Sequence, residues 1–352
     1  MRIALDATPL TLTTGGLARY TGELSAALAA HHPEDDFVLL SDRLFHMPAS
    51  QHPNLLRGAP TRNALEKRWW TWGVQREMSR LGCTLFHGTN FEVPYAPLRP
   101  SVVTVHDLSP WMNPAWHYAA GRVRRRAPLL LGLGIATMII TDSTAVRYQV
   151  MERFRVAPSR VVAVPLGASE TFRPVQPESR APYFLYAGTL EPRKNLDQLI
   201  ETWRAIRRTC PVDLVLAGRE RADYTRPVSE PGLHLTGEVS DTDLARLYAG
   251  ALAVVYPSHH EGFGLPVLEA MQCGACVFIS QDAALREVGG DAALILDGPG
   301  AWADAMRAAV GDPEWLDARR HASLVRSREF SWARTARLTH DVYEEAVRRF
   351  PF

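Results

Sequence analysis

The stretch YFLYAGTLEPRKNLDQLIETW, from Tyr183 to Trp203, contains a complete strand–loop–helix unit. Its first five residues are apolar or aromatic, which is typical of a strand buried on both faces. Gly188 ends the predicted strand, and from Leu196 the apolar residues recur at the spacing of an amphipathic helix. A buried strand joined to a helix by a short loop is the repeating unit of parallel α/β sheets.

The same alternation extends over most of the chain. Strands are predicted at 2–7, 36–41, 84–89, 101–107, 136–143, 160–167, 183–188, 212–218, 233–239, 251–258, 275–280 and 293–297. Helices are predicted at 17–30, 144–154, 196–208, 241–249 and 266–271. Two successive series of this kind indicate an α/β protein with two doubly wound, Rossmann-like domains that face each other across a ligand-binding cleft.

A polar, proline-containing segment marks the predicted boundary between the domains. We expect an N-terminal domain at 1–168, a linker at 169–182 and a C-terminal domain at 183–330. The last stretch, 331–352, is one amphipathic helix with no strand after it. We expect this helix to cross back and pack across both domains.

Composition narrows the class of protein. The chain has 352 residues, 46% of them hydrophobic, and a formal net charge of +1, which is typical of a globular protein and gives no indication of a nucleic-acid partner. The N-terminus lacks the features of a secretion signal, and the apolar run at 127–141 is too short to span a bilayer. We expect a cytoplasmic protein. Cys273 and Cys276 form a C-x-x-C with no second pair, which favours two buried thiols over a metal or redox site.

The segment HHEGFGLPVLEA, His259 to Ala270, holds two glutamates eight positions apart. Pro266 fits the first turn of a helix that begins near Leu265, so Glu261 lies in the preceding loop and Glu269 in the helix. The loop and helix start expose the backbone N–H groups of Gly262, Phe263, Gly264 and Leu265. Such a site favours a hydroxyl-rich or anionic ligand, and the carboxylates suit sugar hydroxyls. The alternative is a solvated Glu261 and a Glu269 that only complements the helix dipole.

Arg193 and Lys194 lie where the helix after Gly188 begins. Two cations beside a helix N-terminus are unfavourable unless an anion joins them, and a pyrophosphate would satisfy both. The alternative is an exposed basic pair.

Two further segments point to the N-terminal half of a cleft. Gly15 and Gly16 follow the first predicted strand, where a Gly-Gly pair can let a ligand approach the backbone. The alternative is that the glycines serve only the turn between strand and helix. His106 ends the strand of SVVTVHD, where a side chain can orient or polarise an acceptor hydroxyl. A structural histidine with satisfied hydrogen bonds is the alternative for His106.

A series of motifs along nearly the whole chain resembles, in its order, the motifs of GT-B fold retaining glycosyltransferases of family 4. They are the N-terminal Gly-Gly, HGTNFEVP, TVHDLSP, TDSTAVRYQV, RVVAVPLGAS, GTLEPRKN, LVLAGR, LTGEVSDTDLARLY, the E-x7-E of Glu261 and Glu269, and the terminal FSW helix. Each motif is common by itself, whereas the ordered set is specific.

The resemblance implies roles for matching residues. Arg193 and Lys194 would clamp the donor diphosphate and stabilise charge on the leaving group, Glu261 would hold the transferred hexose, and His106 would lie beside the reacting sugar. Donor contacts would come from Glu269 at the ribose, Val239 at the base, and the backbone of Gly15, Gly16, Gly188, Gly262, Phe263, Gly264 and Leu265. The family retains anomeric configuration and needs no metal, so we expect no metal or cofactor, and His259 and His260 are loop and core residues.

The resemblance also implies the substrates. We expect a hexose, with mannose favoured, to pass from a GDP- or UDP-linked donor to a glycan or lipid-linked acceptor in surface polysaccharide synthesis. Cys276 and Arg286 stand where many members have proline, which leaves the donor hexose open. An inactive GT-B sugar-binding subunit and a sugar-nucleotide epimerase are the alternative functions.

Peripheral membrane contact at the inner face is a further expectation. The basic stretch GRVRRR, 121–126, and the aromatic WWTW, 69–72, both fall in the N-terminal domain and could dock on an anionic membrane. The alternative is a solvated helix face with core tryptophans.

Overall fold

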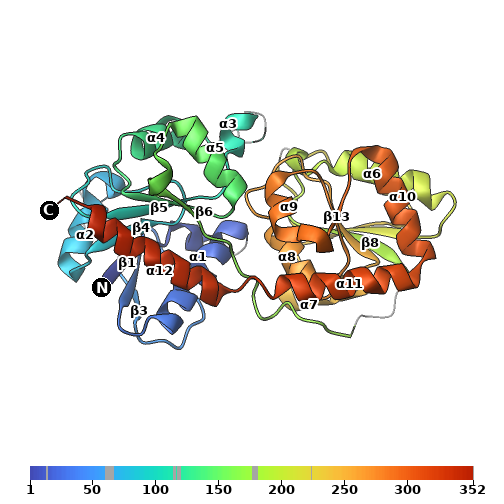
Figure 1. The fold of residues 1–352 in the computed structure, drawn as a ribbon, viewed down its shortest axis with the longest axis horizontal. Coiled ribbons are helices and arrows are strands. Elements are labelled where there is room, and N and C mark those ends of the chain that lie inside the picture. The colour runs from blue at the N-terminus through green and yellow to red at the C-terminus, as the bar shows by residue number, and fades with distance from the viewer. Residues whose placement is uncertain are drawn as a thin grey trace. The chain divides into compact units, whose positions relative to one another are not determined.

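The computed structural model describes residues 1–12, 15–59, 67–113, 116, 120–176, 181–222 and 224–351. The chain divides into two compact units: Met1–Gly167 with Ser331–Phe352, and Ala168–Phe330. Each unit has its own parallel sheet, with helices packed on it (Figure 1).

In the first unit, the described residues form a seven-stranded sheet in the order β3-β2-β1-β4-β5-β6-β7. The strands are β1 (Arg2–Asp6), β2 (Asp36–Leu40), β3 (Leu55–Arg57), β4 (Leu85–Gly88), β5 (Ser101–Val105), β6 (Met138–Thr141) and β7 (Val161–Ala163). The helices are α1 (Gly16–His31), α2 (Val74–Leu81), α3 (Ser109–Met112), α4 (Gly121–Gly132), α5 (Thr144–Phe154) and α12 (Trp332–Arg349). Central strands such as β4, β5 and β6 are buried along their whole length, as expected where helices cover both faces.

In the second unit, the described residues form a six-stranded sheet in the order β10-β9-β8-β11-β12-β13. The strands are β8 (Tyr183–Ala187), β9 (Asp213–Ala217), β10 (Leu233–Gly237), β11 (Ala253–Tyr256), β12 (Val277–Ile279) and β13 (Leu294–Ile295). The helices are α6 (Leu196–Arg207), α7 (Asp241–Gly250), α8 (Leu265–Gln272), α9 (Ala283–Gly289), α10 (Gly298–Gly311) and α11 (Pro313–Ser327). In each sheet the first strand lies between two later strands: β1 between β2 and β4, and β8 between β9 and β11. The strand order reverses at this point, which is the switch point where ligands bind in such folds.

The predicted α/β class with two Rossmann-like sheets is confirmed. Helix α8 begins at Leu265 and α6 spans Leu196–Arg207, within one residue of the predicted bounds. The sequence pattern missed β3, α2, α3, α9, α10 and α11, which are short or lie in segments without a clear apolar period.

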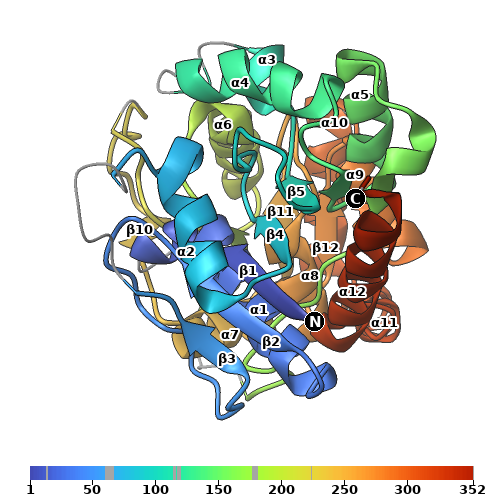
Figure 2. The same ribbon diagram turned by 90° about the vertical axis from the view of Figure 1, so that its left-hand side faces the viewer.

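The terminal helix and the predicted linker differ from expectation. Helix α12 packs beside α1 and against β5 and β6 (Figures 1 and 2). It is grouped with the first unit, so the chain crosses back as expected, but the helix is part of that unit and not a separate element. In the predicted linker, residues 177–180 lie outside the described residues, but the start of the segment belongs to the second unit. The Gln272 side chain donates to the carbonyls of Ser169 and Phe172 at 2.9 and 2.6 Å, and the Phe172 ring is buried against Tyr248.

Gly167 is the last residue of the first unit before the chain enters the second, and it lies against Ser331 and Trp332, where the chain re-enters the first unit. A Cβ at Gly167 would lie 2.3 Å from the backbone nitrogen of Trp332. Glycine is therefore required for this close approach of two backbone segments.

Candidate active site

Arg193, Lys194 and Glu261 meet at the carboxyl ends of neighbouring strands in the second unit. Arg193 and Lys194 belong to a short 3-10 helix between β8 and α6, and Glu261 lies in the loop between β11 and α8. Because β8 and β11 are parallel neighbours, the loops that follow them lie at the same edge of the sheet. The Lys194 Nζ donates to Oε1 of Glu261 at 2.5 Å, and Nη1 of Arg193 donates to Oε2 at 3.2 Å.

These charges are almost completely buried. Lys194 is 5% exposed and Glu261 is 7% exposed. Burial alone would raise the pKa of Glu261, but the charges of Lys194 and Arg193 and the hydrogen bond from Lys194 outweigh it and lower this pKa to about 2. Burial and the neighbouring Arg193 lower the pKa of Lys194, against the opposing effect of Glu261. Glu261 is therefore ionised at neutral pH and accepts from both cations.

Arg193 has a second carboxylate partner that the sequence analysis missed. Oε1 of Glu191 accepts from Nε of Arg193 at 3.1 Å and from Nη2 at 2.8 Å, while Oε2 accepts from Nη1 of Arg221 at 2.8 Å. Glu191 stands two residues before Arg193 in the EPRKN motif, so its closeness in sequence could have identified it as a partner. Arg221 follows β9, and nothing in its sequence neighbourhood predicts a contact with Glu191.

Two stacked tyrosines form the floor beneath Lys194. The rings of Tyr186 and Tyr256 stack with centroids 5.4 Å apart, and the Lys194 ammonium lies 5.2 Å from the Tyr256 ring centroid and 3.3 Å from its hydroxyl. Gly188 has φ +142°, and a Cβ there would lie 3.0 Å from the Tyr186 hydroxyl. A larger residue at position 188 would crowd the tyrosine that supports the cation site.

The start of α8 has the predicted form. Gly264 caps the helix with φ +106°, a conformation that favours glycine, and a Cβ there would lie 2.6 Å from a Leu285 side-chain carbon. The carboxylate of Glu269 is buried in α8 and accepts from the Tyr248 hydroxyl at 3.4 Å. The other predicted donor residues here are Gly262, Phe263 and Leu265, at the entry to α8, and Val239, half-buried between β10 and α7.

The predicted site residues of the first unit lie in segments that follow β1 and β5. Gly15 and Gly16 are exposed at the start of α1, and His106 follows β5. His106 lies next to Asp142 because β5 and β6 are paired in register, with Val105 opposite Thr141.

Both ring nitrogens of His106 contact protein acceptors. Nδ1 lies 2.7 Å from Oδ2 of Asp142, and Nε2 lies 2.9 Å from the carbonyl oxygen of Thr89. Since a carbonyl only accepts, Nε2 carries a proton. Burial would lower the pKa of His106, but Asp142 and the two hydrogen bonds raise it. This geometry favours the structural alternative for His106, because neither nitrogen is left as a base.

The cysteine and histidine expectations also have clear positions. Cys273 and Cys276 are free, buried thiols, as predicted, and burial raises the pKa of each to about 12. His259 is exposed in the loop and His260 is buried, also as predicted.

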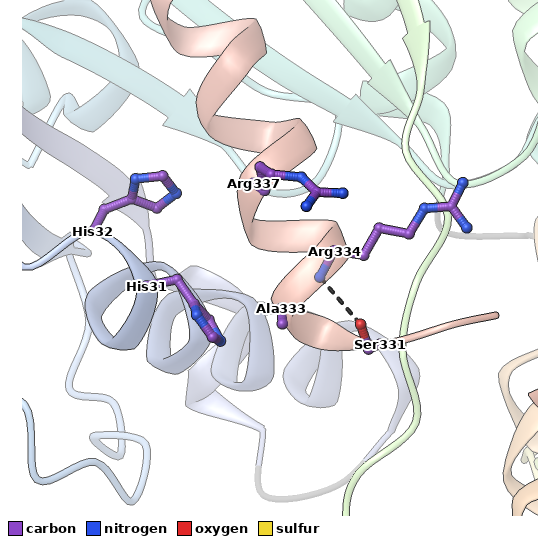
Figure 3. A pocket seen from close by; sticks show the side chains of 6 residues that line it. All are labelled: His31, His32, Ser331, Ala333, Arg334 and Arg337. Atoms are coloured by element: carbon purple, nitrogen blue, oxygen red, sulfur yellow. Dashed lines mark hydrogen bonds between the residues drawn. The ribbon is translucent and has the colours of Figure 1, made fainter. Parts of the chain in front are cut away.

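A cavity of about 430 Å³ lies away from the predicted site residues, in the first unit. It is lined by His31, His32, Ser331, Ala333, Arg334 and Arg337 (Figure 3). The imidazole rings lie on one side of α12 in this view and the guanidinium groups on the other, so these side chains do not converge. His32 also stacks on His340 with ring centroids 3.9 Å apart and planes within 4°, so their in-plane nitrogen lone pairs lie in two parallel planes and do not converge on one ion.

No helix in the described part of the chain combines the length and apolarity needed to cross a bilayer.

Comparison with known proteins gives matches to two family models, to curated relatives and to solved structures. The model of "Glycosyltransferase Family 4" matches residues 14–172, and that of "Glycosyl transferases group 1" matches residues 181–312. O-antigen chain mannosyltransferase B of Escherichia coli is 30% identical, over 98% of this chain and 100% of the relative. The serotype-specific mannosyltransferase WbdA of Escherichia coli is 28% identical over 68% of this chain and 32% of its own length.

Solved structures share the fold. HepE of Anabaena, in complex with UDP-glucose, superimposes with a TM-score of 0.75 at 16% identity, over 98% of this chain and 100% of HepE. With two parallel sheets, a full-length relative and both family models in agreement, this chain belongs to the GT-B glycosyltransferases of group 1, family 4.

Proposed function

We propose that the protein transfers a mannosyl residue from a nucleotide-diphosphate sugar to a growing surface glycan, with retention of anomeric configuration. The observation that carries the proposal is the buried group of Arg193, Lys194 and Glu261, in which two cations lie together at a loop–helix junction. The name of the full-length relative supports mannose as the sugar and an O-antigen type of acceptor.

In this proposal, Arg193 and Lys194 bind the donor diphosphate. Both cations pair with Glu261. An arriving diphosphate competes for them, and Glu261 is then released to accept hydrogen bonds from the hexose hydroxyls. The cations stabilise the charge that develops on the leaving phosphate, in a site where burial makes that stabilisation strong.

The remaining donor contacts follow from the same unit. Glu269 accepts hydrogen bonds from the ribose, the backbone near Val239 contacts the base, and the amides that open α8 hold the hexose. Gly15 and Gly16 in the first unit contribute backbone contacts to the diphosphate or the acceptor. His106, held by Asp142 and by the Thr89 carbonyl, is proposed to lie beside the reacting sugar.

Retention requires that the acceptor approach from the face of the leaving group. The acceptor oxygen bonds to the anomeric carbon as the bond to the phosphate oxygen breaks, and the acceptor proton passes to the leaving phosphate. In this proposal Glu261 accepts hydrogen bonds from the hexose hydroxyls and does not act as a glycosidase-type nucleophile. The proposal includes no metal, since Arg193 and Lys194 supply the positive charge.

The proposed acceptor is a glycan or lipid-linked glycan, reached at the inner face of the membrane from the cytoplasm. Helix α4 carries the basic stretch. Three of its arginines are engaged within the fold: Arg122 pairs with Glu92, Arg124 donates to the Pro110 carbonyl and Arg126 lies over the Tyr95 ring. Arg125 and Leu129 in α4, and Leu133, the residue that caps its end in a helical conformation, follow at four-residue intervals and are all exposed. These three residues form the α4 stripe that we propose as the membrane contact.

A thermal-shift panel of GDP, UDP, ADP and dTDP, each with and without its common hexose conjugates, tests the donor. A ligand that binds only the folded protein raises the melting temperature by mass action. We expect GDP or UDP to raise it, with a further rise for the mannose conjugate. No shift with any nucleotide would support the inactive sugar-binding subunit instead.

Product analysis separates the transferase from an epimerase. With the donor identified by the panel and an oligomannoside acceptor, NMR of the product should show a new glycosidic bond with the anomeric configuration of the donor. An inverted bond would refute retention, and a free epimerised nucleotide sugar would refute transfer.

A further inference from the structure

Glu191 occupies a position between two arginines inside the second unit. It is 6% exposed, with one carboxylate oxygen on Arg193 and the other on Arg221. A buried carboxylate is costly unless charged or hydrogen-bonded partners compensate it, and Glu191 has three N–H donors from two guanidinium groups. The contact to Arg193 uses both Nε and Nη2, which fixes the plane of that guanidinium.

The backbone holds this arrangement rigidly. The loops after β8 and β9 continue side by side: the N–H of Leu190 donates to the carbonyl of Arg219 at 2.8 Å, and the N–H of Arg221 donates to the carbonyl of Leu190 at 3.1 Å. Glu191 and Arg221 thus extend from two segments that are bonded to each other directly beside them. The pair is fixed to the sheet edge from both loops.

The opposite edge of Arg193 faces the proposed donor site. Its Nη1 donates to the carbonyl of His260 at 2.5 Å and to Glu261 at 3.2 Å. One edge of the guanidinium is therefore held by Glu191, and the other is presented beside Lys194. An arginine that must meet a diphosphate in one geometry gains from being held in advance, because displacement by about 1 Å can cost about 100-fold in rate.

We propose that Glu191 is a positioning residue for the diphosphate site, that it orients Arg193, and that Arg221 supplies the counter-charge that keeps Glu191 in place. The proposal rests on the proposed function, in which Arg193 binds the donor diphosphate. Neither Glu191 nor Arg221 contacts the donor in this account. Their effect passes through Arg193 alone.

Isothermal titration with matched nucleotides tests this role. GDP and GMP, and UDP and UMP, differ within each pair by one phosphate, so the ratio of the two affinities reports on the diphosphate contacts. In Glu191→Gln, the amide oxygen can accept from one arginine, but the NH₂ group donates and therefore meets the donor N–H groups of the other. One of the two arginines must turn away. We expect the preference for the diphosphate to fall about tenfold, the value of one charge-assisted hydrogen bond.

Three variants distinguish positioning from a general structural role. Glu191→Asp keeps the carboxylate and should restore part of the preference. Glu191→Gln should have no further effect on the ratio in an Arg193→Ala background. Glu230→Gln is the matched control, because Glu230 holds Arg204 through the same two nitrogens, Nε at 2.8 Å and Nη2 at 2.7 Å, at an exposed site. It should leave the ratio unchanged.

The outcomes distinguish a failure of the proposed function from a failure of the positioning role alone. If the wild-type protein binds neither diphosphate, the proposed function is refuted and this inference with it. If the wild type prefers a diphosphate and Glu191→Gln keeps that preference, or loses it equally in the Arg193→Ala background, the positioning role alone is refuted. Should Glu191→Gln fail to fold, Arg221→Gln alters the same network from its more exposed end and should show the same fall.

Discussion

The ammonium of Lys194 lies 2.5 Å from Oε1 of Glu261, although the two residues are far apart in sequence and follow different strands. Both are buried, and a buried ion pair is weak evidence for stability because desolvation offsets much of the attraction. In the proposed function, this pair is part of a binding site, where a diphosphate takes the place of Glu261 at Lys194, since both are anions with oxygen acceptors.

Lys194→Ala should lower turnover by about 10²- to 10³-fold, because it removes a preorganised positive charge from the leaving group. Lys67 is the chain's other lysine and is exposed, so Lys67→Ala is a matched control that should keep full turnover. Turnover is measured as nucleotide release with the donor identified by the thermal-shift panel. Near-normal turnover in Lys194→Ala, with an unchanged circular dichroism spectrum, would contradict the diphosphate assignment.

The lowered pKa of Glu261 predicts how stability depends on pH. Its folded pKa, about 2, lies below its ordinary value, so it contributes stability that is present above the ordinary value and is lost as pH falls toward 2. We expect urea unfolding at a series of acidic pH values to show a steeper loss of unfolding free energy for wild type than for Glu261→Gln. Parallel curves for the two proteins would mean that Glu261 is not paired in solution.

The sequence predicted the loop–helix junctions well because their signals are local. A proline at the first turn of α8 and the glycine at position 264 determine where that helix begins, and both are visible in nine residues of sequence. Glu191, Arg193 and Arg221 form one network, but Arg221 joins it only because β8 and β9 are neighbours. Strand order is a property of the whole sheet and cannot be predicted from the segment around Glu191 or from the segment around Arg221.

The pairing of His106 with Asp142 also depends on strand order and could not be predicted from the sequence. Each ends a predicted strand, and they meet because β5 and β6 are adjacent with Val105 opposite Thr141. Helix α12 is a second case: its apolar stripe predicts that one face is buried, but the pattern does not identify the surface that buries it. The structure places that face on α1 and the first sheet.

The contact between His106 and Asp142 predicts a pH effect of opposite sign to that of Glu261. The folded pKa of His106 is raised, so its contribution to stability is full below its ordinary value and is lost as pH rises through the folded value. Asp142→Asn should lower the unfolding free energy by about 2 kcal/mol at pH 6, and by less at higher pH.

Chemical unfolding of wild type and Asp142→Asn at a series of pH values from 6 upward measures this difference. The control is Asp341→Asn, an exposed position on α12, which should match wild type. A turnover loss in Asp142→Asn with unchanged stability would contradict the structural interpretation of His106 and favour its role toward the acceptor.

The α4 stripe of Arg125, Leu129 and Leu133 gives the last prediction. Leu129 is 56% exposed and Leu133 is 73% exposed, and Arg125, one helical turn before Leu129, suits an anionic bilayer surface. Arg125→Glu with Leu129→Ser should weaken sedimentation with vesicles that contain about 30% phosphatidylglycerol by at least about fivefold, the worth of one surface arginine. Leu44→Ser is the control, since Leu44 is 83% exposed outside α4 and should leave vesicle binding unchanged. Equal sedimentation of the α4 variant and wild type, or no sedimentation of either, would mean that α4 is a solvated helix face and that the acceptor is reached without this contact.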